Sequence, residues 1–476
     1  MSTEVATASR RYFSAEIAAG ITTLVSVVVF SRALSPSEYG LYSLMMGVGS
    51  IALTLGVEWL QASALRRLPT IASRSHFIAH MKATGLFALA AFVVIGGICL
   101  LLHEALADRF PGRVVLAGWI FGVTSAPYFL VLTCHQARLR SSTVRMARVV
   151  YVVSKLGIAC ILLYFMGANW YGPALGAILA PLVVLPVVSL QVLKHLDRTE
   201  GRAELPIRQI WRFGSPLIGW YAANQILNVS DRFFIEGFLS TDQVGIYSVN
   251  YALAASLIAA VMQPLLQAAY PVLVRSSAAS SGSVAPQMGK LLLLVLCVLP
   301  PVVVLLTVFG PSFVRLVSDT PYVASRWVLA TLALGVSCWH VALFLQKMME
   351  IDGATAKLFG HIAFAALLNI VANVLLIPVF GILGAAVGTL AAYLVYLFKI
   401  LPNPRSLWPD NSWRFVAGRV GVALLGLSAT AWLVPKILPA LGGGSWIVAC
   451  VCSALSYVIL LRRGGLSYRI IVQDGL

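Results

Sequence analysis

Long apolar runs, separated by short polar segments, follow one another along the whole chain. We find about 14 such runs of roughly 20 residues, the length at which an α-helix crosses the hydrocarbon core of a bilayer. Uninterrupted apolar runs of this length are typical of membrane-spanning helices, whereas exposed strands alternate apolar and polar positions. The pattern therefore predicts an all-α polytopic membrane protein with about 14 transmembrane helices.

The predicted spans take up most of the sequence, and each boundary is placed only to within a few residues. They lie near 12–31, 41–62, 83–102, 114–134, 149–166, 173–193, 214–239, 246–270, 290–310, 326–346, 358–377, 383–400, 415–434 and 445–461. The connections between them are short. We therefore expect the function to reside in the spans themselves.

Composition supports this fold class and excludes a soluble enzyme. Of the 476 residues, 59% are hydrophobic and only 11% are charged. A soluble domain has about a quarter of its residues charged. Too few charges remain here to cover the surface of a water-soluble protein of this size.

The excess of positive charge is best explained by membrane topology. The chain has 34 Lys and Arg against 17 Asp and Glu, for a net charge of +17. With the N-terminus placed in the cytoplasm, roughly 25 basic residues fall in loops on that side and about six on the other, as the positive-inside rule requires. This distribution predicts an even number of spans with both termini cytoplasmic, and gives no reason to expect a nucleic-acid partner.

An internal repeat indicates two related halves. The pattern L-S-x-x-x-x-G-[LI]-Y-S-[LV] occupies 34–44 and recurs about 205 residues later at 239–249, and a weaker echo pairs Gly176-Ala177 with Gly384-Ala385. An offset of six spans is even, so both copies enter the membrane in the same sense, as in transporters with parallel repeats. We expect a six-helix lobe over 1–200, a second over 201–401, and two extra helices with a tail over 402–476.

Span seven is the least lipid-like segment. It carries six polar side chains: Asn224, Gln225, Asn228, Asp231, Arg232 and Glu236. Four of them recur at intervals of three, four and four residues and therefore share one helical face: Gln225, Asn228, Arg232 and Glu236. Because a charge at bilayer depth costs about 2.5–3.5 kcal/mol, this face is expected to line a cavity. The alternative is that Arg232 and Glu236 form an i,i+4 pair anchoring the helix end.

Three further charged residues within predicted spans are candidate site residues. Lys155 in span five either lines the same cavity or extends its ammonium group to the interface along its apolar stem. Glu16 and Glu58, together with Asp231 and Glu236, are candidates for a carboxylate coupled to a proton or cation gradient, or for structural charge pairs.

No motif indicates a metal, a cofactor or ATP. The seven cysteines are scattered through apolar stretches without metal-ligand spacing. The chain has neither a P-loop nor a G-x-G-x-x-G opening a helix. We therefore expect no metal site, no cofactor and no direct use of ATP.

Three segments, in order along the chain, resemble signatures of bacterial polysaccharide transport proteins. They are Ser31 to Tyr42, Ser230 to Ile235 followed by Val244 to Ser248, and Asn369 to Pro378 followed by Phe380 to Ala386. The chain is similar to the O-antigen and exopolysaccharide flippases of the Wzx type, in the superfamily that includes the multidrug MATE exporters.

The resemblance implies a MATE-like fold of two six-helix lobes around a central cavity, with two appended helices. It implies a bacterial inner-membrane protein that flips an oligosaccharide carried on a polyprenyl diphosphate, and a polysaccharide polymerase is a candidate partner. Arg232, Lys155 and Arg32 would bind the diphosphate through charge-assisted hydrogen bonds. The amides of Asn224, Gln225 and Asn228 would bind sugar hydroxyls.

Two other functions stay open. A proton- or sodium-coupled MATE-type antiporter for lipophilic cations would use the same architecture, but needs a cavity dominated by carboxylates and aromatic walls. A membrane glycosyltransferase, polymerase or ligase would need a long external loop or a metal-binding carboxylate site, and neither is visible in the sequence.

Overall fold

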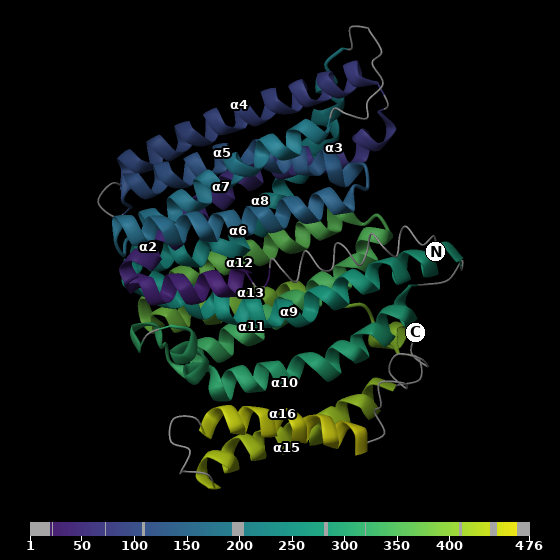
Figure 1. Ribbon diagram of the computed structural model, residues 1–476. Coiled ribbons are helices and arrows are strands. Elements are labelled where there is room, and N and C mark those ends of the chain that lie inside the picture. The colour runs from purple at the N-terminus through teal and green to yellow at the C-terminus, as the bar shows by residue number, and fades with distance from the viewer. Residues whose placement is uncertain are drawn as a thin grey trace. The chain divides into compact units, whose positions relative to one another are not determined.

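The structure is a computed structural model that describes residues 20, 22–71, 73–106, 110–192, 204–279, 284–318, 320–408, 412–437 and 445–463. Helices account for nearly all of these residues (Figure 1). Twelve of the described helices are long and apolar enough to cross a membrane. The prediction of an all-α polytopic membrane protein is confirmed.

Two of the fourteen predicted spans are absent from these twelve. The seventh corresponds to α8 (Ile207–Phe238), which is 32 residues long but carries the polar side chains of the stripe. The first is described as a shorter apolar helix, Thr22–Ala33. The count of fourteen is therefore approximate.

The chain divides into two compact units, Met1–Ser248 and Val249–Leu476. The long helices of the first unit are α2 (Pro36–Leu53), α3 (Trp59–Arg67), α4 (Arg74–Leu106), α5 (Gly112–Ala137), α6 (Ser141–Met166), α7 (Tyr171–Val192) and α8. α9 (Thr241–Ala279) begins in the first unit and ends in the second. The predicted division into lobes at residues 200 and 401 follows the repeat and stays a prediction.

The second unit contains α10 (Ala285–Val317), α11 (Arg326–Ile351), α12 (Thr355–Phe380), α13 (Ile382–Ile400), α14 (Pro404–Leu407), α15 (Ser412–Ile437) and α16 (Ser445–Arg463). Further short elements are the π-helix Thr54–Glu58 and the 3₁₀-helix Leu68–Thr70 in the first unit, and the 3₁₀-helix Thr320–Tyr322 in the second. α12 packs on α13, and α15 packs on α16 (Figure 1). Tyr457 of α16 donates a hydrogen bond to the carbonyl of Cys297 in α10 at 2.6 Å. The last two helices are thus bound to α10.

Local sequence explains where several helices begin. The Ser35 hydroxyl accepts from the backbone N–H of Glu38, with Pro36 at the first helical position of α2. Ser325 caps α11 in the same way. Between α12 and α13 the chain turns at Gly381, whose φ of +60° suits a residue without a Cβ atom.

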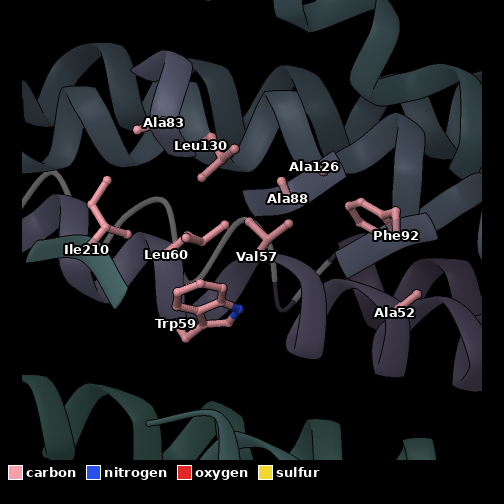
Figure 2. Packing of buried hydrophobic residues seen from close by; sticks show 10 residues of the cluster. All are labelled: Ala52, Val57, Trp59, Leu60, Ala83, Ala88, Phe92, Ala126, Leu130 and Ile210. Atoms are coloured by element: carbon pink, nitrogen blue, oxygen red, sulfur yellow. The ribbon is translucent and has the colours of Figure 1, made fainter. Parts of the chain in front are cut away.

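A buried apolar cluster in the first unit surrounds Trp59 (Figure 2). Its members come from α2 to α5 and α8: Ala52, Val57, Trp59, Leu60, Ala83, Ala88, Phe92, Ala126, Leu130 and Ile210. The Trp59 ring meets Phe87 and Trp211 edge-to-face, with centroids 5.5 and 6.0 Å apart. This packing fixes the segment that precedes α3.

Several helices extend beyond the predicted spans. α4 begins at Arg74 instead of near 83, and α6 begins at Ser141 instead of near 149. The sequence estimate ended each span at the edge of its apolar run. Polar and basic residues do not stop a helix once it has formed, since each added residue gains a backbone hydrogen bond.

Both glycines of the weaker echo lie against the helix that precedes their own. Gly176 of α7 lies against α6, where a Cβ atom would come 2.7 Å from the carbonyl oxygen of Lys155. Gly384 of α13 lies against α12, where a Cβ atom would meet the carbonyl of Leu376. Each glycine therefore allows its helix to pack closely on the preceding one.

Candidate functional site

Two of the predicted site residues, Gln225 and Glu58, lie on either side of the Thr54 hydroxyl. The side-chain amide of Gln225 donates to the hydroxyl of Ser50 at 2.5 Å. The hydroxyl of Thr54 lies 3.1 Å from Glu58 Oε1 and 3.5 Å from Gln225 Oε1, and its single proton serves one of them at a time. The polar stripe of α8 thus meets α2 and Glu58 inside the first unit.

Glu58 is held by an irregular helical turn. Residues Thr54–Glu58 form a π-helix between α2 and α3. Trp59, which follows it, is buried in the apolar cluster and donates from its indole N–H to the carbonyl of Leu55 at 2.9 Å. Such wide turns replace the regular i→i−4 bonds and occur frequently at functional sites.

Beside this turn lies a cavity of about 520 Å³ within the first unit. Its lining combines charged and amide groups with aromatic walls: Glu58, Gln61, Gln136, Arg148, Tyr128, Phe129, Tyr151 and Tyr221. Tyr128 and Tyr151 stack with centroids 4.9 Å apart. The cavity can therefore offer a cation, a carboxylate, amides and ring faces to one ligand.

Apart from Glu58, none of these lining residues is a predicted site residue. The charged one among them is Arg148, which the predicted span near 149–166 leaves in a loop, whereas α6 begins at Ser141. Arg148, Tyr151 and Lys155 are spaced three and four residues apart, so they share one face of α6. Extending the helical spacing backward from Lys155 would have found it.

Lys155 lies near the middle of α6. Its ammonium nitrogen is 6.0 Å from the centroid of the Tyr42 ring, a cation–π geometry. Tyr42 is buried. The side chain thus points at a neighbouring helix of the bundle.

The charged residues of α8 are engaged with their own helix and with the start of α9. Asp231 is 1% exposed and accepts a hydrogen bond from the hydroxyl of Tyr247 at 2.5 Å. Arg232 Nη1 lies 3.6 Å from Asp231 Oδ1 and donates to the carbonyl oxygen of Asn228 at 2.8 Å. This places the guanidinium beside a buried carboxylate.

The remaining stripe residues have local partners too. The amide of Asn228 donates to the carbonyl of Asn224 at 2.8 Å. Glu236 accepts from the hydroxyl of Thr241, the first residue of α9, at 2.8 Å, and its Oε2 is buried without a hydrogen-bond partner. Among the stripe residues, Gln225 is the one whose hydrogen bonds lead towards the cavity.

The two copies of the main repeat motif meet each other in the first unit. Gly40 lies against the backbone of Thr241, and Gly245 lies against the backbone of Pro36. These are equivalent motif positions, because Pro36 and Thr241 each precede their glycine by four residues. Equivalent hydroxyls also meet, with Ser43 Oγ 2.7 Å from Ser248 Oγ. We call this contact the repeat joint.

Of the predicted site residues that the structure describes, Glu58 is the one that lines the cavity beside the π-helix. Arg32 is exposed near the end of the helix Thr22–Ala33 and does not line the cavity. Glu16 lies outside the described residues. Over the described residues, no group of three or more His, Cys, Asp or Glu is placed to hold a metal.

The second unit holds a polar cluster that the sequence did not reveal. Tyr396 donates to Gln346 Oε1 at 2.7 Å, and Gln346 donates to Glu350 Oε1 at 2.7 Å. Lys347 forms an ion pair with Glu350 at 2.8 Å. The i,i+4 spacing of Gln346 and Glu350 on α11 is the signal that could have found it.

Comparisons with known proteins agree with this architecture. The family model described as "Polysaccharide biosynthesis protein" matches residues 11–277, more than half of the chain. An uncharacterized membrane protein of Methanocaldococcus jannaschii, MJ1068, is 21% identical, with 81% of this chain and 80% of that protein covered.

Two solved structures show the same fold. The lipid II flippase MurJ in an inward closed conformation has a TM-score of 0.75 at 12% identity, covering 97% of this chain and 99% of its own. An inward-facing MATE family multidrug resistance transporter has a TM-score of 0.61 at 14% identity, covering 83% and 95%. The predicted MATE-like fold is confirmed.

Proposed function

Because the chain belongs to the polysaccharide biosynthesis protein family, we propose that it is a flippase for a lipid-linked oligosaccharide. The cargo would be a polyprenyl-diphosphate-linked repeat unit for O-antigen, capsule or exopolysaccharide. It would cross the bacterial inner membrane by alternating access, with both termini of the protein in the cytoplasm. MurJ, the flippase of lipid II, has the same fold at 12% identity.

The observation that carries the proposal is the cavity beside the π-helix. It brings Arg148, Gln61 and Gln136 together in helices that are otherwise strongly apolar. A guanidinium is suited to a diphosphate, with which it forms bidentate charge-assisted hydrogen bonds. Amide and tyrosine groups are suited to sugar hydroxyls.

The predicted site residues have different roles in this proposal. Lys155, on the same face of α6 as Arg148, is the second cation for the diphosphate. Arg232 with Asn224, Gln225 and Asn228 would contact the cargo along α8, and Arg32 would act at the outer end. Glu58, Asp231, Glu236 and Glu16 are the candidate coupling carboxylates, and Glu58 is favoured because it lines the cavity.

The test compares two arginines on the same helix. Arg148→Gln removes the cavity cation, while Arg145→Gln removes an exposed arginine one turn earlier. We expect Arg148→Gln to reduce export of surface polysaccharide at least tenfold and to cause lipid-linked repeat units to accumulate in the cytoplasmic leaflet. Arg145→Gln should export normally, with both proteins present in the membrane at wild-type levels. Equal export by the two variants would refute the role of this cavity.

A second function is favoured by one observation. Glu58 lies among Tyr128, Tyr151 and Tyr221, and a carboxylate with aromatic walls also suits a lipophilic cation. A multidrug antiporter of this kind would lose resistance to a cationic dye in Glu58→Gln and gain it in Arg148→Gln. If the chain is a flippase, neither Glu58→Gln nor Arg148→Gln should change resistance to the dye.

A further inference from the structure

A second cavity, of about 720 Å³, lies at one end of the first unit. It forms where α3 ends, α4 begins and the chain enters α8. Seven polar residues line it: Arg67, Thr70, Ser73, His76, His80, Glu204 and Gln209. It shares no lining residue with the cavity beside the π-helix.

The floor of this cavity contains polar atoms that are buried and unpaired in the described structure. His80 is 1% exposed, and neither of its ring nitrogens has a hydrogen-bond partner. Arg67 Nη1 is likewise buried without a partner. Leaving such groups unsatisfied costs about 1–3 kcal/mol each, and more for a charged one. A ligand with acceptor oxygens would supply the partners that these groups lack.

The unpaired groups are mainly donors. A guanidinium donates only, and a histidine ring carries at least one N–H in either tautomer. The turn that positions Arg67 is fixed locally, since the hydroxyl of Thr70 donates to the Arg67 carbonyl at 2.8 Å. A ligand with several acceptor oxygens and negative charge fits this floor.

One further arginine lies beside the cavity, because Arg138 Nη2 is 3.5 Å from the carbonyl oxygen of the lining residue Ile71. Arg66 is not among the lining residues, and its guanidinium lies over the ring of Phe213 at 4.6 Å. This is the end of the unit that the distribution of basic residues places in the cytoplasm. Glu204 is an exposed carboxylate in the lining, where water screens its repulsion of an anion.

We propose that this cavity binds a phosphate group through Arg67 and His80 at the cytoplasmic end of the first unit. The phosphate belongs either to the headgroup of an anionic phospholipid or to free inorganic phosphate. The site is separate from the cargo cavity, so it stands whether or not the chain is a flippase.

The experiment measures thermal unfolding of the purified full-length protein in detergent at constant ionic strength. The probes are inorganic phosphate, short-chain phosphatidylglycerol, and chloride as the reference. If inorganic phosphate raises the unfolding temperature, free phosphate is sufficient to occupy the site. If phosphatidylglycerol alone raises it, the ligand is the lipid headgroup. In both cases we expect Arg67→Gln and His80→Gln to weaken the apparent affinity at least tenfold, while the adjacent Arg66→Gln retains it.

A charge change in the exposed part of the lining tests the sign of the ligand without disturbing buried groups. Glu204→Gln should tighten the binding of phosphate by several-fold, because it removes a like charge. No stabilisation by either probe, equal effects of Arg66→Gln and Arg67→Gln, or weaker binding in Glu204→Gln would each overturn the proposal. Should Arg67→Gln fail to fold, Glu204→Gln on its own decides the outcome.

Discussion

Gly40 and Gly245 occupy positions where the neighbouring backbone leaves no room for a side chain. Each lies against a carbonyl group of the opposite motif copy, Thr241 for Gly40 and Pro36 for Gly245. A carbonyl within a helical turn cannot rotate away as a flexible side chain can. The close approach of α2 and α9 therefore depends on both glycines.

Gly245→Ala is expected to destabilise the protein by about 1–3 kcal/mol, the usual cost of overpacking, and Gly40→Ala should behave alike. The matched control is Gly237→Ala in α8, where an added Cβ atom meets nothing within 4 Å. The control should be neutral or slightly stabilising, since alanine is the better helix former. Thermal unfolding in detergent provides the measurement. A Gly245→Ala protein as stable as the Gly237→Ala control would contradict the role of the close contact.

At the scale of elements, the π-helix Thr54–Glu58 determines how Glu58 is presented. A π-turn contains one more residue than the corresponding α-helical turn, and the helices on either side absorb the difference locally. Here the flanking segments are held by the buried cluster around Trp59. The backbone conformation of this turn can thus change while the flanking helices stay packed.

Deletion of Leu55 is expected to convert this turn to a regular helix. The fold should survive, with an unfolding temperature close to that of the wild type, because α2 and α3 keep their packing. Export should fall at least tenfold, because Glu58 changes its spacing from Thr54. Leu55→Ala, which keeps the extra residue, is the control. Normal export by the deletion variant would show that the wide turn has no functional role.

Apolar runs in the sequence predicted which segments are helices. They did not predict where each helix begins and ends, or which residues line the cavity. Apolar runs locate a membrane helix because the bilayer demands them, but they do not mark where the helix continues into polar surroundings. Arg148 was assigned to a loop for this reason. Gln225 and Glu58 were both singled out by their polarity at bilayer depth, yet only the packing of α8 against the π-helix shows that both lie beside the Thr54 hydroxyl.

At the scale of the whole molecule, the proposed alternating access requires a contact that opens and closes. The repeat joint is a candidate, because α9 leaves it and continues into the second unit. The hydrogen bond between Ser43 and Ser248 is a single contact, and one such bond contributes only about 0.5–1.5 kcal/mol to stability.

A cross-link across the repeat joint tests this expectation. In a background without the seven native cysteines, Ser43→Cys with Ser248→Cys should form a disulfide, because the replaced hydroxyls are 2.7 Å apart. Export should stop when the bond forms and resume on reduction, while each single variant exports under both conditions. Full export by the cross-linked protein would mean that α2 and α9 stay together throughout the cycle.

The symmetry of the repeat joint has an evolutionary consequence. Residue i of one motif touches residue j of the other, and residue j touches residue i, which is the isologous arrangement of a twofold dimer. An ancestral polypeptide of half the length, with a single motif, would already possess both sides of this interface. Gene fusion would have preserved the association and made it intramolecular, with the glycines of the contact kept in both copies.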